Sequence, residues 1–111
     1  MNEVIILPTF EKEARRLIKK YRSLVTEISD FISTSEADGV QGTHLGNGIY
    51  KSRLSVKSKG RGKSGGVRII SYSEIYFSKQ ENNIYLVFIY DKSDISSVKR
   101  SEIEKILKEY R

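Results

Sequence analysis

The sequence predicts an α+β domain in which a small antiparallel sheet is combined with an N-terminal helical hairpin and a C-terminal helix. Three observations predict this class. Two segments near the N-terminus carry apolar residues at helical spacing, three β-like runs follow at 49–56, 67–75 and 84–90, and a last helical pattern ends the chain. Consecutive strands with short links are typical of an antiparallel meander with helices packed on one face. At 111 residues, we expect one domain spanning 1–111.

The N-terminal third predicts an edge strand and two helices. The apolar run 4–7 stops at a proline, which is tolerated at the edge of a sheet. Thr9 is the expected N-cap of a helix from 10 to about 21, and Ser23 is expected to cap a second helix from 24 to about 33. The expected order is therefore β-α-α-β-β-β-α, and the helical hairpin is expected to cover one face of the sheet.

The rest of the chain predicts the sheet and the final helix. Residues 34–48 form a polar, glycine-containing break. In 49–56 the residues alternate, which indicates a half-buried strand with a basic outer face. The run 84–90 is almost entirely apolar and predicts a central strand buried on both faces. Ser101 and Glu104 match a capping box that starts a helix too short to be stable unless it docks.

Positive charge is concentrated in one segment. Between Gly39 and Ser73 there is no Asp or Glu, although the formal charge of the chain is +6. The cations of this interval are Lys51, Arg53, Lys57, Lys59, Arg61, Lys63 and Arg68. Charge focused in this way is expected of a surface that binds a polyanion.

Composition excludes several classes of protein. Without cysteine there are no disulfides, cysteine–zinc sites or thiol catalysis, and a cytoplasmic setting is the simplest expectation. The N-terminal residues lack the features of a signal peptide, and no apolar run approaches the roughly 20 residues that span a bilayer. A single histidine makes a transition-metal site improbable, and the glycine-rich run lacks the spacing of a nucleotide-binding P-loop.

Three segments carry a recognisable pattern. They read GIYKSRLSVKSKGRGKSGGVRIISY, then IYLVFIYDKSD, then SEIEKILKEY. With these residues in this order, the chain resembles the RelE/ParE superfamily of bacterial type II toxins, and most closely its HigB-like branch. The resemblance implies a RelE-like fold, mRNA cleavage at the ribosomal A site, where the enzyme meets mRNA and ribosomal RNA, and neutralisation by a cognate antitoxin protein.

Ribonuclease chemistry of this kind needs no metal or cofactor. The ribose 2′-OH attacks the adjacent phosphate, so the enzyme has to accept a proton, stabilise charge at phosphorus and protonate the leaving 5′-oxygen. Arg68 is the expected stabiliser, because it follows a glycine pair and its guanidinium can hold phosphate oxygens in two hydrogen bonds. The alternative is an arginine on the outer face of the sheet that pairs with a carboxylate.

The glycine-rich basic loop is the expected RNA-binding segment. Lys57, Lys59, Arg61 and Lys63 alternate, so an extended chain would place them on one side as a row of cations. Together with Lys51 and Arg53 they are expected to bind RNA phosphates, with a strong dependence on salt. Lys57 or Lys59 is a candidate general base if neighbouring cations lower its pKa. The alternative is a solvated loop.

The end of the apolar strand supplies two further candidates. Tyr90 can stack on a base or donate a proton, and Lys92 can bind phosphate. Relatives of the RelE type usually carry a glycine and additional cations here, whereas Ser93 follows Lys92 in this chain. Tyr90 is equally compatible with a place in the core. The single histidine, His44, lies in the glycine-containing break and is expected to be structural or exposed.

Two other functions remain open from the sequence. One is a ParE-like toxin of the same fold that inhibits DNA gyrase without cutting RNA. The other is an RNA-binding module without catalytic activity, because a fold does not determine an activity. The resemblance, Arg68 and the lysine-rich loop favour the ribosome-dependent endoribonuclease.

Overall fold

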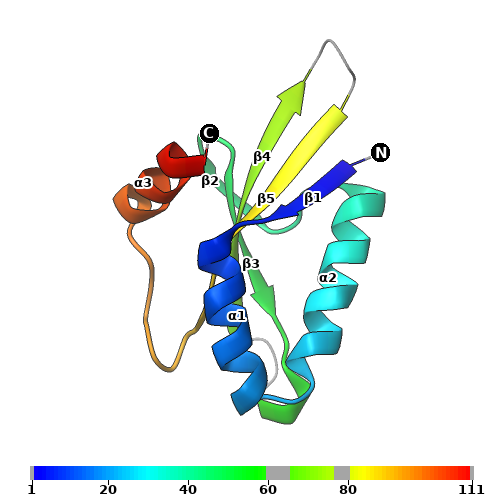
Figure 1. The fold of residues 1–111 in the computed structure, drawn as a ribbon, viewed down its shortest axis with the longest axis vertical. Helices are drawn as coiled ribbons and strands as arrows, with labels where there is room; N and C mark the ends of the chain where they lie inside the picture. Colours follow the sequence, from blue (N-terminus) through cyan, green and yellow to red (C-terminus); the bar gives the residue numbers. More distant parts are fainter. Residues whose placement is uncertain (1, 60–65, 77–80, 111) are drawn as a thin grey trace.

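The computed structural model describes residues 2–59, 66–76 and 81–110 (Figure 1). Its elements follow the order β1 (Asn2–Ile6), α1 (Pro8–Lys20), α2 (Leu24–Asp38), β2 (Thr43–Gly46), β3 (Ile49–Leu54), η1 (Lys57–Lys59, a 3-10 helix), β4 (Val67–Tyr76), β5 (Glu81–Asp91) and α3 (Arg100–Tyr110). The predicted α+β class is confirmed.

The strands form one five-stranded sheet in the order β1-β5-β4-β3-β2. The predicted antiparallel meander is confirmed, since β3, β4 and β5 pair consecutively and antiparallel. The sheet as a whole is mixed, however, because β1 pairs with β5 in parallel, with Val4 opposite Ile84. The link between β4 and β5 is too short for the crossover that parallel pairing needs, whereas β1 and β5 are separated by helices and other strands and can pair in parallel.

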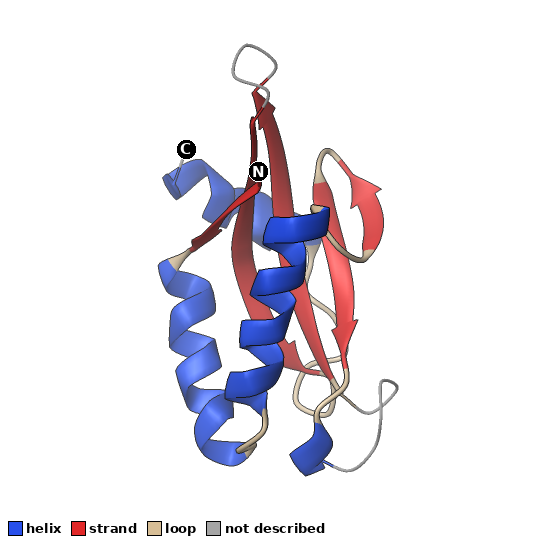
Figure 2. Ribbon diagram, turned by 90° about the vertical axis from the view of Figure 1, so that its right-hand side faces the viewer, coloured by secondary structure: helices blue, strands red, loops and turns tan. Residues whose placement is uncertain are grey.

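Helices cover both faces of the sheet. One apolar cluster joins α1 and α2 to the sheet through residues such as Leu17, Leu24 and Ile89. A second cluster joins α3 to the opposite face through Ile103 and Leu107. Figure 1 shows α2 and α3 on opposite sides of the strands, and Figure 2 shows the two long helices side by side along the sheet. The expectation that all helices pack on one face is therefore wrong.

A central strand with two apolar faces explains this arrangement. The side chains of β5 alternate between the two clusters, with Leu86 and Ile89 toward α1 and α2, and Val87 and Tyr90 toward α3. The prediction that 84–90 is central and buried on both faces is confirmed. Because β5 presents apolar side chains on two faces, the fold needs a cover on each of them.

A bulge in β5 also positions the start of α1. The pairing with β4 shifts between Ile70 and Ser71, which leaves Val87 without a partner of its own. The Thr9 hydroxyl donates to the Val87 carbonyl at 2.6 Å. Thr9 is thus not the N-cap that the sequence predicted, since α1 begins at Pro8 and Leu7 occupies the cap position.

The polar break contains structure that the sequence analysis did not predict. Helix α2 continues to Asp38, beyond the expected end near 33, and β2 follows it. Asn47 and Gly48, with φ of 52° and 78°, connect β2 to β3 in a two-residue hairpin. Asn-Gly is a strong hairpin signal, so the sequence did carry the information for this turn.

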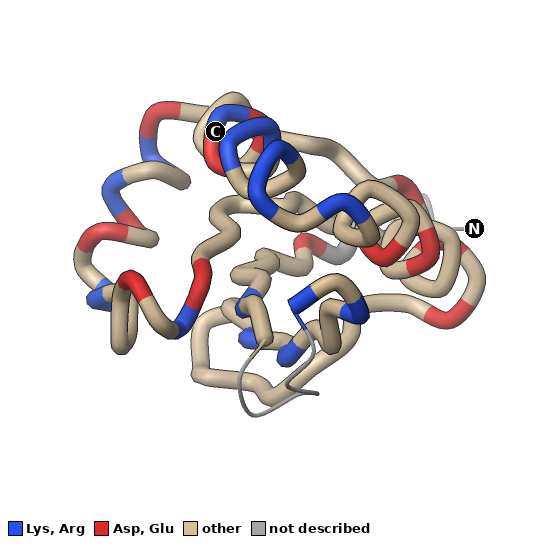
Figure 3. The backbone as a smooth tube through the Cα atoms, turned by 90° about the horizontal axis from the view of Figure 1, so that it is seen from below, with Lys and Arg blue, Asp and Glu red and all other residues tan. Residues whose placement is uncertain are grey.

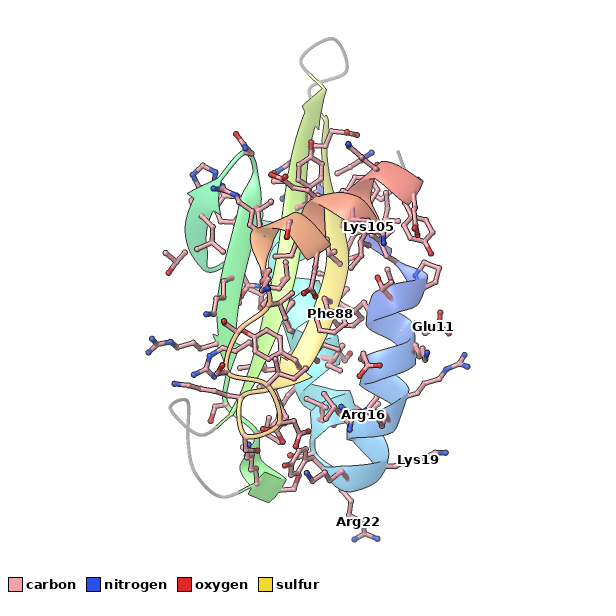
Figure 4. The ribbon with its side chains drawn as sticks, turned by 90° about the vertical axis from the view of Figure 1, so that its left-hand side faces the viewer. Glu11, Arg16, Lys19, Arg22, Phe88 and Lys105 are labelled. Atoms are coloured by element: carbon pink, nitrogen blue, oxygen red, sulfur yellow. The ribbon has the colours of Figure 1, made fainter. Side chains whose placement is uncertain are left out.

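The C-terminal helix docks on the sheet as expected. It begins at Arg100, one residue before the predicted cap Ser101, a difference within the usual uncertainty of helix ends. Figure 4 looks onto this face and shows Phe88 of β5 next to α3, with Lys105 on the helix above the sheet. Of the helices that the structure describes, none combines the length and apolar character needed to cross a membrane.

Candidate functional site

Three neighbouring strands place candidate residues in one row. Arg53 of β3 lies opposite Arg68 of β4, and Arg68 lies opposite Tyr90 of β5. Residues directly opposite in an antiparallel pair share a face, and Lys51 shares it because it is two residues from Arg53. Tyr90 belongs to the cluster under α3, so this is the α3 side of the sheet. We call Lys51, Arg53, Arg68 and Tyr90 the basic row.

The two arginines of the basic row form a cross-strand pair of like charge. Such pairs are destabilising in a sheet. Arg53 is exposed, whereas only 2% of Arg68 is exposed, and an Nη of Arg68 donates to the Val67 carbonyl at 3.5 Å. A phosphate next to both guanidinium groups would accept charge-assisted hydrogen bonds from them. The arrangement therefore favours an anion as ligand.

Open hollows flank the exposed end of the basic row. One, of about 470 Å³, is lined by Lys51 and Arg53 of β3 together with residues of β2 and the preceding Gly42. Another, of about 400 Å³, lies between α2 and β3, and Arg53 lines it as well. Gly42 has φ +99°, and a Cβ there would lie 2.4 Å from the Lys51 carbonyl oxygen. A side chain at position 42 would therefore disturb β3 where it carries its cations.

The start of the basic loop is a 3-10 helix and not an extended segment. In η1 the Lys57 side chain is exposed, whereas the Lys59 side chain is only 10% exposed. The predicted one-sided row of loop cations is therefore wrong for these two lysines. Arg61 and Lys63 lie outside the described residues. Seen from below, several Lys and Arg positions gather around the strands and this short helix (Figure 3).

Two contacts with the helical hairpin fix the backbone of η1. The amide of Lys57 donates to a carboxylate oxygen of Glu27 at 2.8 Å, and the amide of Ser58 donates to the Ser23 hydroxyl at 2.9 Å. The amide of Ser23 donates in return to the Ser58 hydroxyl at 3.2 Å. The base of the loop is thus tied to the turn between α1 and α2.

Lys59 is bound to a buried carboxylate. Asp91, the last residue of β5, has no exposed surface, and its Oδ1 accepts hydrogen bonds from the Lys59 ammonium and, at 2.9 Å, from the Ser93 amide. The Ser93 hydroxyl donates to the same oxygen at 2.6 Å. The other oxygen, Oδ2, accepts from the Tyr21 hydroxyl at 2.5 Å, and the Lys20 ammonium lies 3.9 Å away. We call Asp91, Lys59, Tyr21 and Ser93 the Asp91 cluster.

The Asp91 cluster keeps the carboxylate charged. Burial alone would raise the pKa of Asp91, but the hydrogen bonds from Lys59, Ser93 and Tyr21 outweigh burial and hold that pKa well below its usual range. Asp91 is therefore ionised at neutral pH, and it forms an ion pair with the ammonium of Lys59. The general-base role predicted for Lys59 is not tested by this geometry and stays a prediction.

Tyr90 and Lys92 flank Asp91 in the sequence, whereas His44 lies in the β2–β3 hairpin. Tyr90 is 1% exposed, with its ring 6.3 Å from that of Phe88, so its side chain belongs to the core under α3. Its role as proton donor stays a prediction, as does phosphate binding by Lys92, whose side chain is exposed. His44 has the structural place that was expected, because its Nε2 accepts the Gly48 amide at 3.2 Å in the β2–β3 hairpin.

The sequence analysis missed the acidic residues that approach the basic segment. Asp91 and Glu27 come from β5 and α2, outside the acid-free interval. An aspartate at the end of an almost wholly apolar strand was the available signal, since a buried carboxylate requires partners. Over the described ranges 2–59, 66–76 and 81–110, no group of three or more His, Cys, Asp or Glu residues could hold a metal ion.

Comparison with protein families agrees with this architecture. The family model of the RelE toxin of the RelE / RelB toxin–antitoxin system matches residues 4–110. The match spans the elements from β1 to α3, and so includes the basic row and the Asp91 cluster. Because it covers nearly the whole chain, this protein belongs to the RelE toxin family.

Proposed function

We propose that this chain is a toxin that inhibits translation in the cytoplasm by cutting mRNA on the ribosome. The observation that carries the proposal is the pairing of Arg53 with Arg68 next to Tyr90, which concentrates anion-binding groups on adjacent strands. Membership of the RelE toxin family supports a toxin that is neutralised by an antitoxin. The HigB-like branch is part of the proposal and rests on the sequence resemblance.

The proposed reaction is an internal transfer at phosphorus. The 2′-oxygen of the ribose forms a bond to the neighbouring phosphorus as its proton passes to a base, and the bond from phosphorus to the 5′-oxygen breaks as that oxygen takes a proton. Arg68 stabilises the charge that develops on the phosphate oxygens. Lys57, whose side chain is exposed, is the candidate base and would accept the proton as a neutral amine, and Tyr90 or Lys92 is the candidate acid.

The other cations hold the RNA. Lys51 and Arg53 line an open hollow beside the basic row and are proposed to bind backbone phosphates. Arg61 and Lys63 are proposed to extend this contact on sequence grounds. Such contacts position the chain without reading its sequence.

Burial of Arg68 supports dependence on the ribosome. With 2% of its surface exposed, Arg68 can meet a phosphate only after covering atoms move. Binding energy from a large partner can drive such a change and orient the mRNA at the same time. We therefore propose that free RNA is a poor substrate and that ribosomal RNA forms part of the binding partner. The antitoxin is proposed to present acidic side chains to the basic row.

A reconstituted translation reaction tests this function. Purified protein is added, and the 5′ ends of the mRNA are mapped by primer extension, with and without ribosomes. New ends inside the reading frame that need both translating ribosomes and an intact Arg68 would support the proposal. Arg68→Ala serves as the inactive control.

Negative results would separate the alternatives. Binding to ribosomes or RNA without new ends would indicate an RNA-binding module without catalytic activity. Absence of both cleavage and RNA binding would overturn the proposal, and a gyrase supercoiling assay would then test the ParE-like function.

A further inference from the structure

The Asp91 cluster joins three segments that are distant in the sequence. Tyr21 is the C-cap of α1, Lys59 ends η1, and Asp91 ends β5, with Ser93 at the start of the connection to α3. The backbone carbonyl of Asp91 also accepts the amides of Asp94 and Ile95 at 3.0 and 3.1 Å. One buried residue thus contacts the end of α1, the end of η1 and the start of the connection to α3.

Two neighbours of Asp91 bear on the candidate catalytic groups. Asp91 lies opposite Val67, the residue directly before Arg68 on β4. Its carboxylate also holds the ammonium of Lys59, two residues after Lys57. Asp91 therefore connects the strand that carries Arg68 with the short helix that carries Lys57.

The core does not require a charged residue at position 91, because the cluster between the sheet and helices α1 and α2 is apolar. Removing a carboxylate and an ammonium from water costs free energy, and the attraction between them often only offsets this cost. The backbone of η1 is already tied to Ser23 and Glu27. Those contacts hold η1 to the helical hairpin, whereas the ion pair between Lys59 and Asp91 holds it to the end of β5.

We propose that Asp91 is a positioning residue of the nuclease site, which holds Lys59 as an anchor so that η1 and Arg68 keep a fixed separation. The inference rests on the proposed function, because it assigns Lys59 to positioning and leaves proton transfer to other groups. The two roles of Lys59 make different predictions, since an anchor needs only a donor to Asp91 whereas a base must release a proton.

Substitutions of Lys59 separate the two roles. Lys59→Arg keeps a cation that can donate to Asp91 but cannot act as a base, because a guanidinium keeps its proton. Lys59→Met removes the donor and keeps much of the chain length. In single-turnover cleavage on programmed ribosomes we expect Lys59→Arg to stay within about threefold of the unaltered protein, and Lys59→Met to fall about 10- to 100-fold. The pH–rate profile of Lys59→Arg should match that of the unaltered protein.

Asp91→Asn tests the other partner. Asparagine has the same shape, so it keeps the space filled while it removes the charge. We expect the cleavage rate to fall about as much as in Lys59→Met. The double variant should be no slower than the slower single variant, because both changes break the same interaction between Lys59 and Asp91. Asp94→Asn is the matched control, since Asp94 is an exposed carboxylate three residues on that contacts Lys20 and Arg16, and its cleavage rate should be unchanged.

Amide hydrogen exchange provides a readout that does not depend on activity. In Asp91→Asn the amides of Lys57–Lys59 should exchange faster, whereas those of α3 should not change. If the unaltered protein fails to cut mRNA, the proposed function fails while exchange still tests the anchor. Unchanged exchange in Asp91→Asn, additive losses in the double variant, or a Lys59→Arg protein as inactive as Lys59→Met would each overturn the positioning role.

Discussion

At the scale of single residues, the pairing of two arginines across adjacent strands conflicts with stability. Arg53 and Arg68 lie directly opposite each other, where like charges are unfavourable. Sequences that break a local rule in this way often do so at functional sites. The cost to the sheet and the benefit to RNA binding should therefore be separable at Arg53, the exposed member of the pair.

We expect Arg53→Gln to stabilise the fold while it weakens RNA binding. The free energy of unfolding should rise by about 0.2–1 kcal/mol, at the low end because the side chain is exposed. Loss of one phosphate contact should reduce the slope of log affinity against log salt by about 0.7. Urea unfolding and RNA binding at several salt concentrations measure the two effects.

The control is Lys105→Gln, which removes the same charge from the exposed surface of α3. It should leave both stability and the salt slope close to those of the unaltered protein. If Arg53→Gln destabilised the sheet and left the slope unchanged, the basic row would be a structural feature only.

Asp91 should make stability depend on acid. The pKa of Asp91 in the folded protein lies below its usual value of 3.8, so the unfolded chain binds the proton first as pH falls. The ionised carboxylate therefore contributes fully to the free energy of unfolding above the pKa of Asp91 in the unfolded chain. This contribution is lost as the pH falls toward the pKa of Asp91 in the folded protein. At neutral pH we expect Asp91→Asn to be less stable than the unaltered protein.

The measurement is urea unfolding of both proteins at pH 7, 5 and 3. The difference in unfolding free energy between them should be constant from pH 7 to 5 and smaller at pH 3. Other carboxyl groups titrate in both proteins and cancel from this difference. A difference that stays constant or grows at pH 3 would contradict an ionised, hydrogen-bonded Asp91.

The sequence predicts a relation between two site residues well when they are close in the sequence, and poorly when they are far apart. The shared face of Lys51 and Arg53 follows from the period of a strand, which involves only neighbouring residues. The partner of Lys59 is 32 positions away, and no pattern within the loop indicates it. The prediction that Lys57 and Lys59 lie in a one-sided row was wrong, because contacts with Ser23 and Glu27 hold this turn in a 3-10 helix.

At the scale of elements, α3 depends on its docking. It has 11 residues, too few for a stable isolated helix, and its buried side chains are Ile103 and Leu107. The sequence predicted this helix and its need to dock. It did not indicate the face, because the apolar stripe of a helix shows what must be buried and not against which side of a sheet.

We expect Leu107→Ala to destabilise the protein by about 2–4 kcal/mol, since the side chain is 4% exposed and leaves a cavity between α3 and the sheet. Lys105→Ala, an exposed change in the same helix, is the control and should alter stability by less than about 0.5 kcal/mol. Denaturant unfolding provides the comparison. A loss below about 1 kcal/mol for Leu107→Ala would show that α3 contributes little to the second core.

At the scale of the whole molecule, the order of elements was readable because each carries its own periodicity. The meander follows from three consecutive β-like runs, and β5 is central because it is apolar on both faces. The parallel pairing of β1 with β5 could not be read in the same way, since it joins segments separated by most of the chain. The family match identifies a RelE toxin, and the excess positive charge of the chain lies between Gly39 and Ser73, where there is no Asp or Glu.

The central claim is that Arg68 acts on the reaction and not merely on binding. The most direct test measures, for the unaltered protein and for Arg68→Ala, both the affinity for programmed ribosomes and the rate of a single turnover at saturating enzyme. We predict an affinity within a few fold, because one contact among many is lost, and a rate at least about 100-fold lower. A lower affinity for ribosomes together with an unchanged turnover rate would contradict the assignment of Arg68 to the transition state.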